Sequence, residues 1–149
     1  MDLAHGLLVV SALVVLYVSG QIWLIQLVVY PLFAKVGAAE YIGYHTFYSS
    51  RIPLPVIIPG FASFLLPIVL VFVRPLAVPL WLALANAACA VIGLLVTVLL
   101  EIPRHGRLER GRDARIIQEL VRFNWPRTLS ITGSAVCSLL MLGAAFLPE

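Results

Sequence analysis

The chain has 149 residues, of which 62% are hydrophobic and 11% charged, and its formal net charge is +3. A soluble domain carries about a quarter charged residues, and a chain of this length cannot hide so much apolar surface inside a core surrounded by water. The composition therefore excludes an ordinary soluble globular domain. It indicates one domain, residues 1–149, whose main solvent is the lipid bilayer.

Four segments contain no Asp, Glu, Lys, Arg or His, at about residues 7–33, 52–73, 79–100 and 129–147. Each approaches or exceeds the roughly 20 residues that a helix needs to cross about 30 Å of hydrocarbon. Backbone hydrogen bonds inside hydrocarbon must close within a segment, so each segment is predicted to be helical. The predicted fold class is all-α, an integral membrane, antiparallel four-helix bundle with short interfacial helices in its first and third loops.

Gln26 and Tyr30 are conspicuous polar residues within the first predicted span. They are four residues apart and therefore share one face of a helix. Polar side chains at membrane depth usually point into the bundle, where interhelical hydrogen bonds satisfy them without any ligand. The alternative is a pocket for an amphipathic small molecule, with Gln26 and Tyr30 in its wall.

The first loop is predicted to contain a short helix over residues 38–50. Tyr41, Tyr44, His45 and Tyr48 recur there at spacings of three and four residues and share one face. Aromatic side chains commonly gather at a membrane boundary, which explains this face without a specific function. Tyr44 and Tyr48 are nevertheless candidates for binding a hydrophobic substrate.

The third loop, residues 101–127, carries seven arginines against four acidic residues, a net charge of 7 − 4 = +3. Within it, residues 113–123 show an apolar stripe opposite charged residues, which predicts a helix along the membrane interface or beneath the bundle. Asn124 is a suitable N-cap for the fourth span, with Pro126 in the first turn of that span. The following Arg127 then stands near the beginning of the fourth span.

Nine of the ten basic residues lie in the first and third loops, and only Arg74 lies in the second. The positive-inside rule therefore predicts that the first and third loops face the cytoplasm and that both termini lie outside, in a cytoplasmic (inner) or plasma membrane. These basic residues are explained by topology and by anionic lipid headgroups, so the bilayer is the expected partner and nucleic acid is not. Small residues in the third and fourth spans permit close helix contacts and are compatible with an oligomer.

Glu101 and Arg127 each stand against a helix dipole. Glu101 ends the third predicted span, where backbone carbonyls are negative, and Arg127 begins the fourth, where amides are positive. Each placement is unfavourable by about 0.3–1 kcal/mol for a residue that stands alone. A Glu101–Arg127 ion pair resolves both conflicts, so the two charges are predicted to lie within hydrogen-bonding distance or to share one polar partner. The pair is interpreted as a structural salt bridge or as part of an active site.

His45 and His105 lie in the loops predicted to be cytoplasmic, close to Glu101 in a compact bundle. Two imidazoles and one carboxylate are enough for a facial metal triad, so a metal ion held by His45, Glu101 and His105 is a minor hypothesis. Their spacing matches no specific motif, and Pro103 is expected to interrupt the helix between Glu101 and His105. Unliganded interfacial histidines are the alternative.

Two short motifs carry a resemblance to a known family. The run Glu101-Ile-Pro-Arg-His-Gly-Arg-Leu108, followed by a helix and by Asn124-Trp-Pro-Arg-Thr128, resembles the anthrone oxygenase-like family of small four-span membrane proteins. The first span ends in Val29-Tyr30-Pro31-Leu32, which also fits that pattern. Members of the family often have Asn-Asn after the proline, where this chain has Arg104-His105. The resemblance implies a four-helix membrane fold and oxidation of a polyketide anthrone without an established metal or organic cofactor.

Two functional hypotheses follow. The first is an oxidoreductase that acts on a hydrophobic aromatic or lipid-like molecule in a pocket on the cytoplasmic side, with His45 or His105 as the base. Arg127 and Asn124 then steady a developing oxyanion. The second is a protein without catalysis that binds a lipid or hydrophobic ligand, or serves as a structural subunit. The predicted substrate-binding residues are Gln26, Tyr30, Tyr44, Tyr48 and Trp125, and no cofactor is identified.

Overall fold

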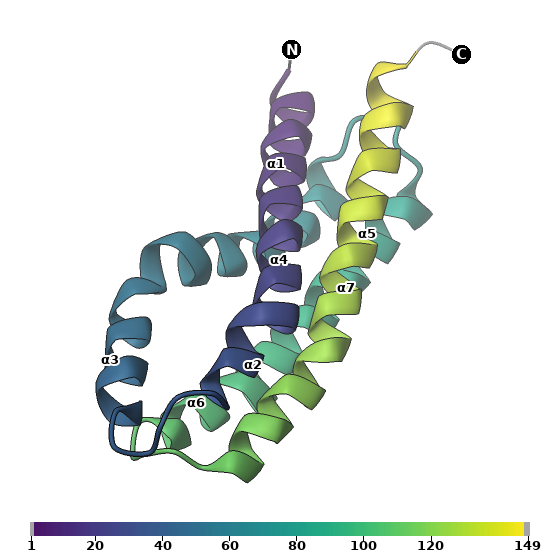
Figure 1. Ribbon diagram of the computed structural model, residues 1–149. Coiled ribbons are helices and arrows are strands. Elements are labelled where there is room, and N and C mark those ends of the chain that lie inside the picture. The colour runs from purple at the N-terminus through teal and green to yellow at the C-terminus, as the bar shows by residue number, and fades with distance from the viewer. Residues whose placement is uncertain (1, 148–149) are drawn as a thin grey trace.

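The computed structural model describes residues 2–147, which form helices and no strand. Three π-helical turns (η) interrupt or precede α-helices along the chain (Figure 1). In order, the elements are α1 (Leu3–Leu24), η1 (Ile25–Val29), α2 (Tyr30–Phe33), α3 (Tyr41–Arg51), η2 (Pro53–Ile57), α4 (Ile58–Val73), α5 (Leu80–Val96), η3 (Thr97–Glu101), α6 (Ile102–Leu108) and α7 (Ala114–Phe146). The all-α fold class is confirmed.

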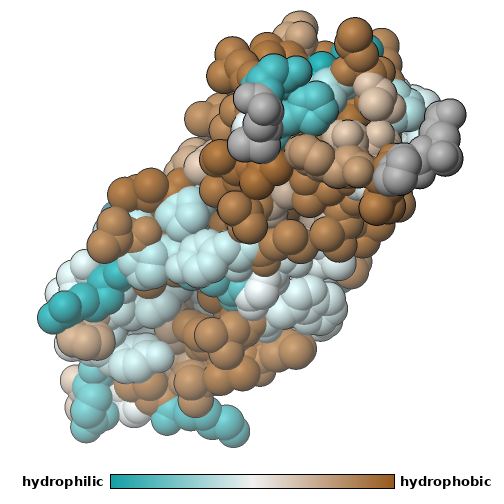
Figure 2. Space-filling view, turned by 90° about the horizontal axis from the view of Figure 1, so that it is seen from above, coloured by the Kyte–Doolittle hydropathy of each residue, from teal (hydrophilic) through white to brown (hydrophobic). Residues whose placement is uncertain are grey.

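Four continuous helical stretches in the described residues are long and apolar enough to cross a membrane. They are Leu3–Phe33, Pro53–Val73, Leu80–Leu108 and Ala114–Phe146. Large hydrophobic side chains are exposed along them, and hydrophobic surface covers much of the face in Figure 2. Such an outer surface suits lipid, because hydrocarbon replaces the apolar core that a soluble bundle needs. The prediction of a polytopic membrane protein is confirmed.

The four long helices form a closed ring of neighbours. The α7 helix packs against α1 and α5, and α4 packs against the same two helices on the other side. The beginning of α1 and the end of α7 lie at one end of the bundle, and α3 and α6 lie toward the other (Figure 1). The polar groups of the loop helices are therefore gathered at a single end of the molecule.

Small and polar side chains set the close approach of α5 to its neighbours. A Cβ atom at Gly93 would lie 2.8 Å from a ring carbon of Phe64, and one at Gly133 would lie 3.1 Å from the Cys89 sulfur. Asn86 of α5 donates to Ser138 of α7 at 3.2 Å. The predicted close contacts between small residues of the third and fourth spans are confirmed.

Each π-helical turn lies directly before a proline. The residue preceding Pro31, Pro59 or Pro103 is the C-cap of such a turn, and its N–H bonds to a carbonyl five residues back. Proline cannot donate a backbone hydrogen bond, and its ring collides with the carbonyl four residues earlier in a regular α-helix. The wider turn allows that carbonyl to move aside, so the helix passes through the proline. The predicted break at Pro103 is therefore wrong, and the third helix continues to Leu108.

The fourth helix also differs from the prediction. Asp113 is its N-cap, and its side chain accepts hydrogen bonds from the backbone N–H groups of Arg115 and Ile116. The expected interfacial helix at 113–123 is thus the first part of α7. Asn124 is not an N-cap, because it lies inside α7 and its side-chain amide donates to Gln26 of the first span. Pro126 also lies inside this helix.

The helix predicted in the first loop is present as α3. Its Tyr41 and His45 are completely buried, and Tyr44 and Tyr48 pack against the same cluster. Phe33, at the end of α2, lies at the centre of this cluster, with ring centroids 5.1–6.4 Å from those of the three tyrosines. Edge-to-face contacts of this kind stabilise aromatic clusters. They fix α3 against the end of the first span.

Candidate functional site

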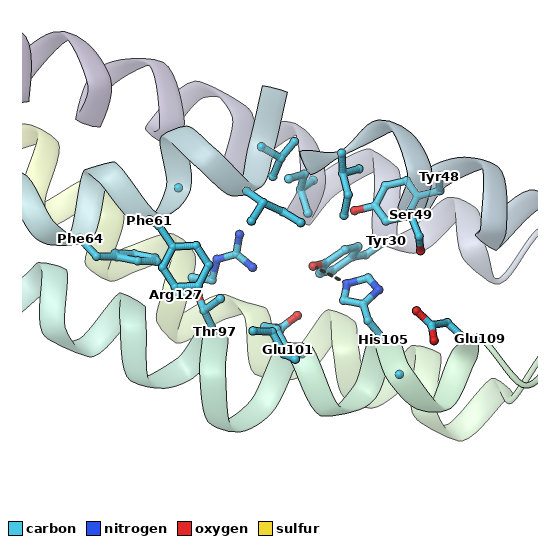
Figure 3. Close-up of a pocket in the computed structure, with 17 residues that line it drawn as sticks. Tyr30, Tyr48, Ser49, Phe61, Phe64, Thr97, Glu101, His105, Glu109 and Arg127 are labelled. Carbon is cyan, nitrogen blue, oxygen red and sulfur yellow. Dashed lines mark hydrogen bonds between the residues drawn. The ribbon is translucent and has the colours of Figure 1, made fainter. Parts of the chain in front are cut away.

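A cavity of about 410 Å³ lies between α2, α3, α4, the η3–α6 segment and α7. Phe61 and Phe64 line one part of it, and Tyr30, Glu101 and His105 line another. Figure 3 shows these side chains turned toward a common space, with Arg127 on the side of the two phenylalanines. The cavity is therefore mostly apolar, with a few polar groups that converge, as in sites for small molecules.

Glu101 and Arg127 both face this cavity and are nearly buried, with 1% and 8% of their surface exposed. They do not form the predicted ion pair, since no oxygen–nitrogen contact within 4.0 Å joins them among residues 2–147. In that part of the chain, both Glu101 carboxylate oxygens and the Arg127 Nε lack a hydrogen-bond partner. Both side chains line the same cavity and do not bond to each other across it. A buried charge without a partner is costly, so the site favours a polar ligand group between them.

A row of hydrogen-bonding side chains runs from the cavity into the aromatic cluster. The Tyr30 hydroxyl lies 3.0 Å from His105 Nε2, and His105 Nδ1 lies 3.4 Å from His45 Nε2. The Ser49 hydroxyl lies 3.5 Å from His45 Nδ1. The helix that continues through Pro103 places His105 one turn after Glu101, which brings both into the cavity wall. Tyr30 and Ser49, at the two ends of the row, line the cavity as well.

His45 itself does not line the cavity but lies behind His105. Burial lowers the pKa of His45, and the negative charge of Glu109 opposes that shift. Burial also raises the pKa of Tyr48 to about 12. Both side chains are therefore neutral at pH 7.

The hypothesis of a metal ion held by His45, Glu101 and His105 is not supported by the geometry. Residues 2–147 contain no group of three or more His, Cys, Asp or Glu side chains placed to hold a metal ion. The facing nitrogens of His45 and His105 are directed at each other. Their remaining nitrogens meet hydroxyl groups, and not Glu101.

Gln26 and Asn124 lie outside the cavity wall, in contrast to their predicted roles in binding and catalysis. Asn124 donates to the Gln26 side-chain oxygen at 2.8 Å, and Gln26 donates to the Val121 carbonyl at 3.0 Å. Thr128 donates to the Asn124 carbonyl at 3.0 Å. These side chains join the first span to α7, so interhelical hydrogen bonding explains them, and Asn124 is not positioned to hold an oxyanion.

Tyr44 and Trp125 are also absent from the cavity wall. Tyr44 packs against Phe33 within the aromatic cluster. Trp125 lies edge-on against Trp23, with ring centroids 5.8 Å apart. Of the residues proposed from the sequence, the cavity is lined by Tyr30, Tyr48, Glu101, His105 and Arg127.

Several lining residues were not proposed from the sequence, notably Ser49, Gly60, Phe61, Phe64 and Thr97. Phe61 and Phe64 lie in an apolar span, where the sequence does not distinguish residues that line a cavity from residues that face lipid. Gly60 does offer a signal, because a glycine one turn before Phe64 leaves room beside the ring. A Cβ atom added at Gly60 meets nothing within 4 Å.

Comparisons of this chain with models of known protein families, with curated proteins and with solved structures find no match.

Proposed function

We propose that the protein is a membrane enzyme that oxidises a hydrophobic aromatic or lipid-like small molecule bound in the cavity. The observation that carries this proposal is the pair of buried, opposite charges, Glu101 and Arg127, that face the same aromatic-lined space without bonding to each other. Glu101 is buried in the cavity wall and both of its carboxylate oxygens are free of hydrogen bonds to the described residues, so it can accept a proton from a bound ligand. Arg127 supplies the positive charge that favours a developing oxyanion.

The chemistry begins with transfer of a proton from the ligand to the Glu101 carboxylate. Negative charge then moves onto a ligand oxygen that faces Arg127. The resemblance to the anthrone oxygenase-like family suggests dioxygen as the oxidant. An activated methylene group and one dioxygen molecule give a carbonyl group and one water molecule, which balances the reaction.

Ligand binding is tested by filling the cavity. Gly60 lines it and has free space beside it, so Gly60→Leu places a side chain where the ligand would lie. Gly20→Leu is the matched control, because Gly20 is exposed in α1 and also has free space beside it. The proteins are purified in nanodiscs, extracted with organic solvent and compared by mass spectrometry. We expect the wild type and Gly20→Leu to retain a hydrophobic molecule that Gly60→Leu lacks. Identical extracts from all three proteins would exclude the cavity as a binding site.

Catalysis is tested with the molecule so identified, under air and without dioxygen. The wild type is expected to replace two ligand hydrogens by one oxygen only under air. Glu101→Gln should retain the ligand and lose about 10²-fold or more of the rate, as removal of a general base does. A ligand that the wild type binds and releases unchanged under air would identify a binding protein without catalysis, the second hypothesis.

A further inference from the structure

His45 is held rigidly behind the cavity wall. Its ring is fully buried and lies nearly parallel to that of Tyr41, with centroids 5.9 Å apart and an interplanar angle of 18°. The edge contact with Phe33, at 5.7 Å, fixes the ring from another side. This packing directs one ring nitrogen at His105 and the other at Ser49. The position of His45 therefore controls the hydrogen bonding of its neighbours.

The two facing histidines must share one hydrogen. A neutral imidazole has one N–H donor and one acceptor nitrogen, so only one of the facing nitrogens of His45 and His105 carries a hydrogen. The partners at the two ends of the row, Tyr30 and Ser49, determine which of the two nitrogens carries that hydrogen. A phenol donates more strongly than it accepts, and an imidazole nitrogen is a good acceptor. The Tyr30 hydroxyl therefore donates to His105 Nε2, and the hydrogen of His105 lies on Nδ1.

The rest of the row follows from that assignment. His105 Nδ1–H donates to His45 Nε2, and His45 Nδ1–H donates to the Ser49 oxygen. The Tyr30 hydroxyl is within hydrogen-bonding distance of His105 Nε2, at 3.0 Å, and neither Glu101 oxygen forms a hydrogen bond with it, so the geometry directs the Tyr30 hydrogen to His105. Both histidines are thus Nδ1–H tautomers.

We propose that His45 is a positioning residue that fixes the tautomer of His105 and thereby turns the Tyr30 hydroxyl hydrogen away from the cavity. The Tyr30 oxygen then presents its lone pairs to the cavity, next to the free oxygens of Glu101. These oxygens accept hydrogen bonds, and Arg127, which also lines the cavity, donates them. The inference rests on the proposed function and narrows its ligand class to hydrophobic molecules that offer an O–H or N–H donor to Tyr30.

The tautomers are measured directly by NMR at pH 7.5 with ¹⁵N-labelled histidine, on protein that is stripped of bound ligand by detergent exchange before it is placed in nanodiscs. The imidazole ¹⁵N shifts distinguish Nδ1–H, Nε2–H and charged rings, and His105→Phe and His45→Phe assign the signals. We expect His45 and His105 to be Nδ1–H in the wild type. In His45→Phe, His105 should change to Nε2–H, because its Nδ1–H would lose its acceptor in a buried site. His45→Gln offers an amide oxygen as acceptor and should retain the wild-type tautomer.

Ser49→Ala is a milder second test, which needs no change in the aromatic cluster. Without the Ser49 oxygen, the His45 Nδ1–H has no acceptor, so the hydrogen bonds of the whole row should reverse and both rings become Nε2–H. The matched control is Ser50→Ala, because the Ser50 hydroxyl donates to the Phe47 carbonyl and takes no part in the row. It should leave both tautomers unchanged.

An Nε2–H hydrogen on His105 in the wild type, a charged ring on either histidine, or identical tautomers in Ser49→Ala and Ser50→Ala would overturn the proposal. These measurements use protein without ligand, so they succeed or fail independently of the proposed enzyme activity. The Gly60→Leu extraction tests the ligand site alone and does not depend on tautomers.

Discussion

At the scale of single residues, the buried polar groups divide into two sets with different roles. Gln26, Asn124 and Thr128 bond to one another at the interface between the first span and α7, and of their polar atoms Asn124 Oδ1 has no partner among the described residues. Glu101 and Arg127 keep polar atoms without partners and face a cavity. Unpaired buried polar groups are uncommon in folded proteins, and among those of the described residues only Glu101 and Arg127 line the cavity, which makes this pair the candidate functional site.

The hydrogen bond between Gln26 and Asn124 should couple the stability of the two helices. Hydrogen bonds between membrane helices contribute about 0.6 kcal/mol on average and up to about 1.7. A double-mutant cycle of Gln26→Leu and Asn124→Leu, measured by unfolding in mixed detergent micelles, should give a coupling energy of about 0.5–1.5 kcal/mol. Gln21→Leu is the control, because Gln21 bonds to the Pro55 carbonyl instead and should be additive with Asn124→Leu. A coupling energy near zero between Gln26 and Asn124 would show that their hydrogen bond does not stabilise the packing of the two helices.

His45 should make stability depend on pH. Its pKa in the folded protein lies below the ordinary value of 6.5, so between the two values the unfolded chain binds more protons than the folded one. The free energy of unfolding then rises with pH, and stability is lost as the pH falls below about 6.5. Thermal unfolding from pH 8 to pH 5 should show a smaller decrease in midpoint for His45→Phe than for the wild type. An equal decrease in both would mean that other groups cause the pH dependence.

At the scale of helices, the apolar runs predicted the existence of the spans but not their ends. Charged residues end an apolar run, but a helix backbone continues wherever its hydrogen bonds are satisfied. Residues 114–128 are therefore part of α7, although Arg115, Gln118 and Arg122 occupy its outer face. The face shared by Tyr41, Tyr44, His45 and Tyr48 was predictable from its spacing. The separation of Glu101 from Arg127 was not predictable, since it depends on how η3 and α7 flank the cavity.

The π-helical turn η3 should tolerate removal of a residue better than a regular helix does. A π turn holds one more residue than the α turn it replaces. Deleting the exposed Leu99, together with Pro103→Ala, should therefore restore an α-helix without rotating α6. Deleting the exposed Leu84 in the same background rotates the following residues of α5 by about 100° and moves Asn86 and Gly93 out of their contacts.

The Leu99 and Leu84 deletions are compared by size-exclusion chromatography and thermal unfolding in detergent. The Leu99 deletion should remain monodisperse with a midpoint within a few degrees of Pro103→Ala alone, and the Leu84 deletion should aggregate. Equal loss of structure in both deletions would show that η3 is not an inserted turn.

At the scale of the whole molecule, helix length and charge divide the bundle into two zones. The 33 residues of α7 extend about 50 Å, whereas the hydrocarbon of a bilayer is about 30 Å thick. Several turns therefore project beyond the hydrocarbon. The end of the bundle near α3 and α6 holds nine of the ten basic residues of the chain, and the cavity opens among the same elements. Ligands are thus expected to enter from the interface at that end.

The charge distribution predicts which end faces the cytoplasm. Lys and Arg near the ends of spans are retained on the cytoplasmic side, so the loop that contains Arg110 should be inside and the loop that contains Leu76 outside. Both residues are exposed. Leu76→Cys and Arg110→Cys, each in a background with Cys89→Ala and Cys137→Ala, can be labelled in intact cells with a maleimide that does not cross membranes. Leu76→Cys should react in intact cells, and Arg110→Cys only after the membrane is permeabilised.

A reporter fused after Glu149 provides an independent measurement, and it should be active only as an external domain. The second loop and the C-terminus follow spans two and four, so both should lie on the same side of the membrane. Labelling of Arg110→Cys in intact cells, combined with a cytoplasmic reporter signal, would show that the topology is the reverse of the predicted one. The cavity would then open to the outside, and its ligand would be sought in the outer leaflet or beyond it. Agreement of both measurements with the charge rule would direct that search to hydrophobic molecules made inside the cell.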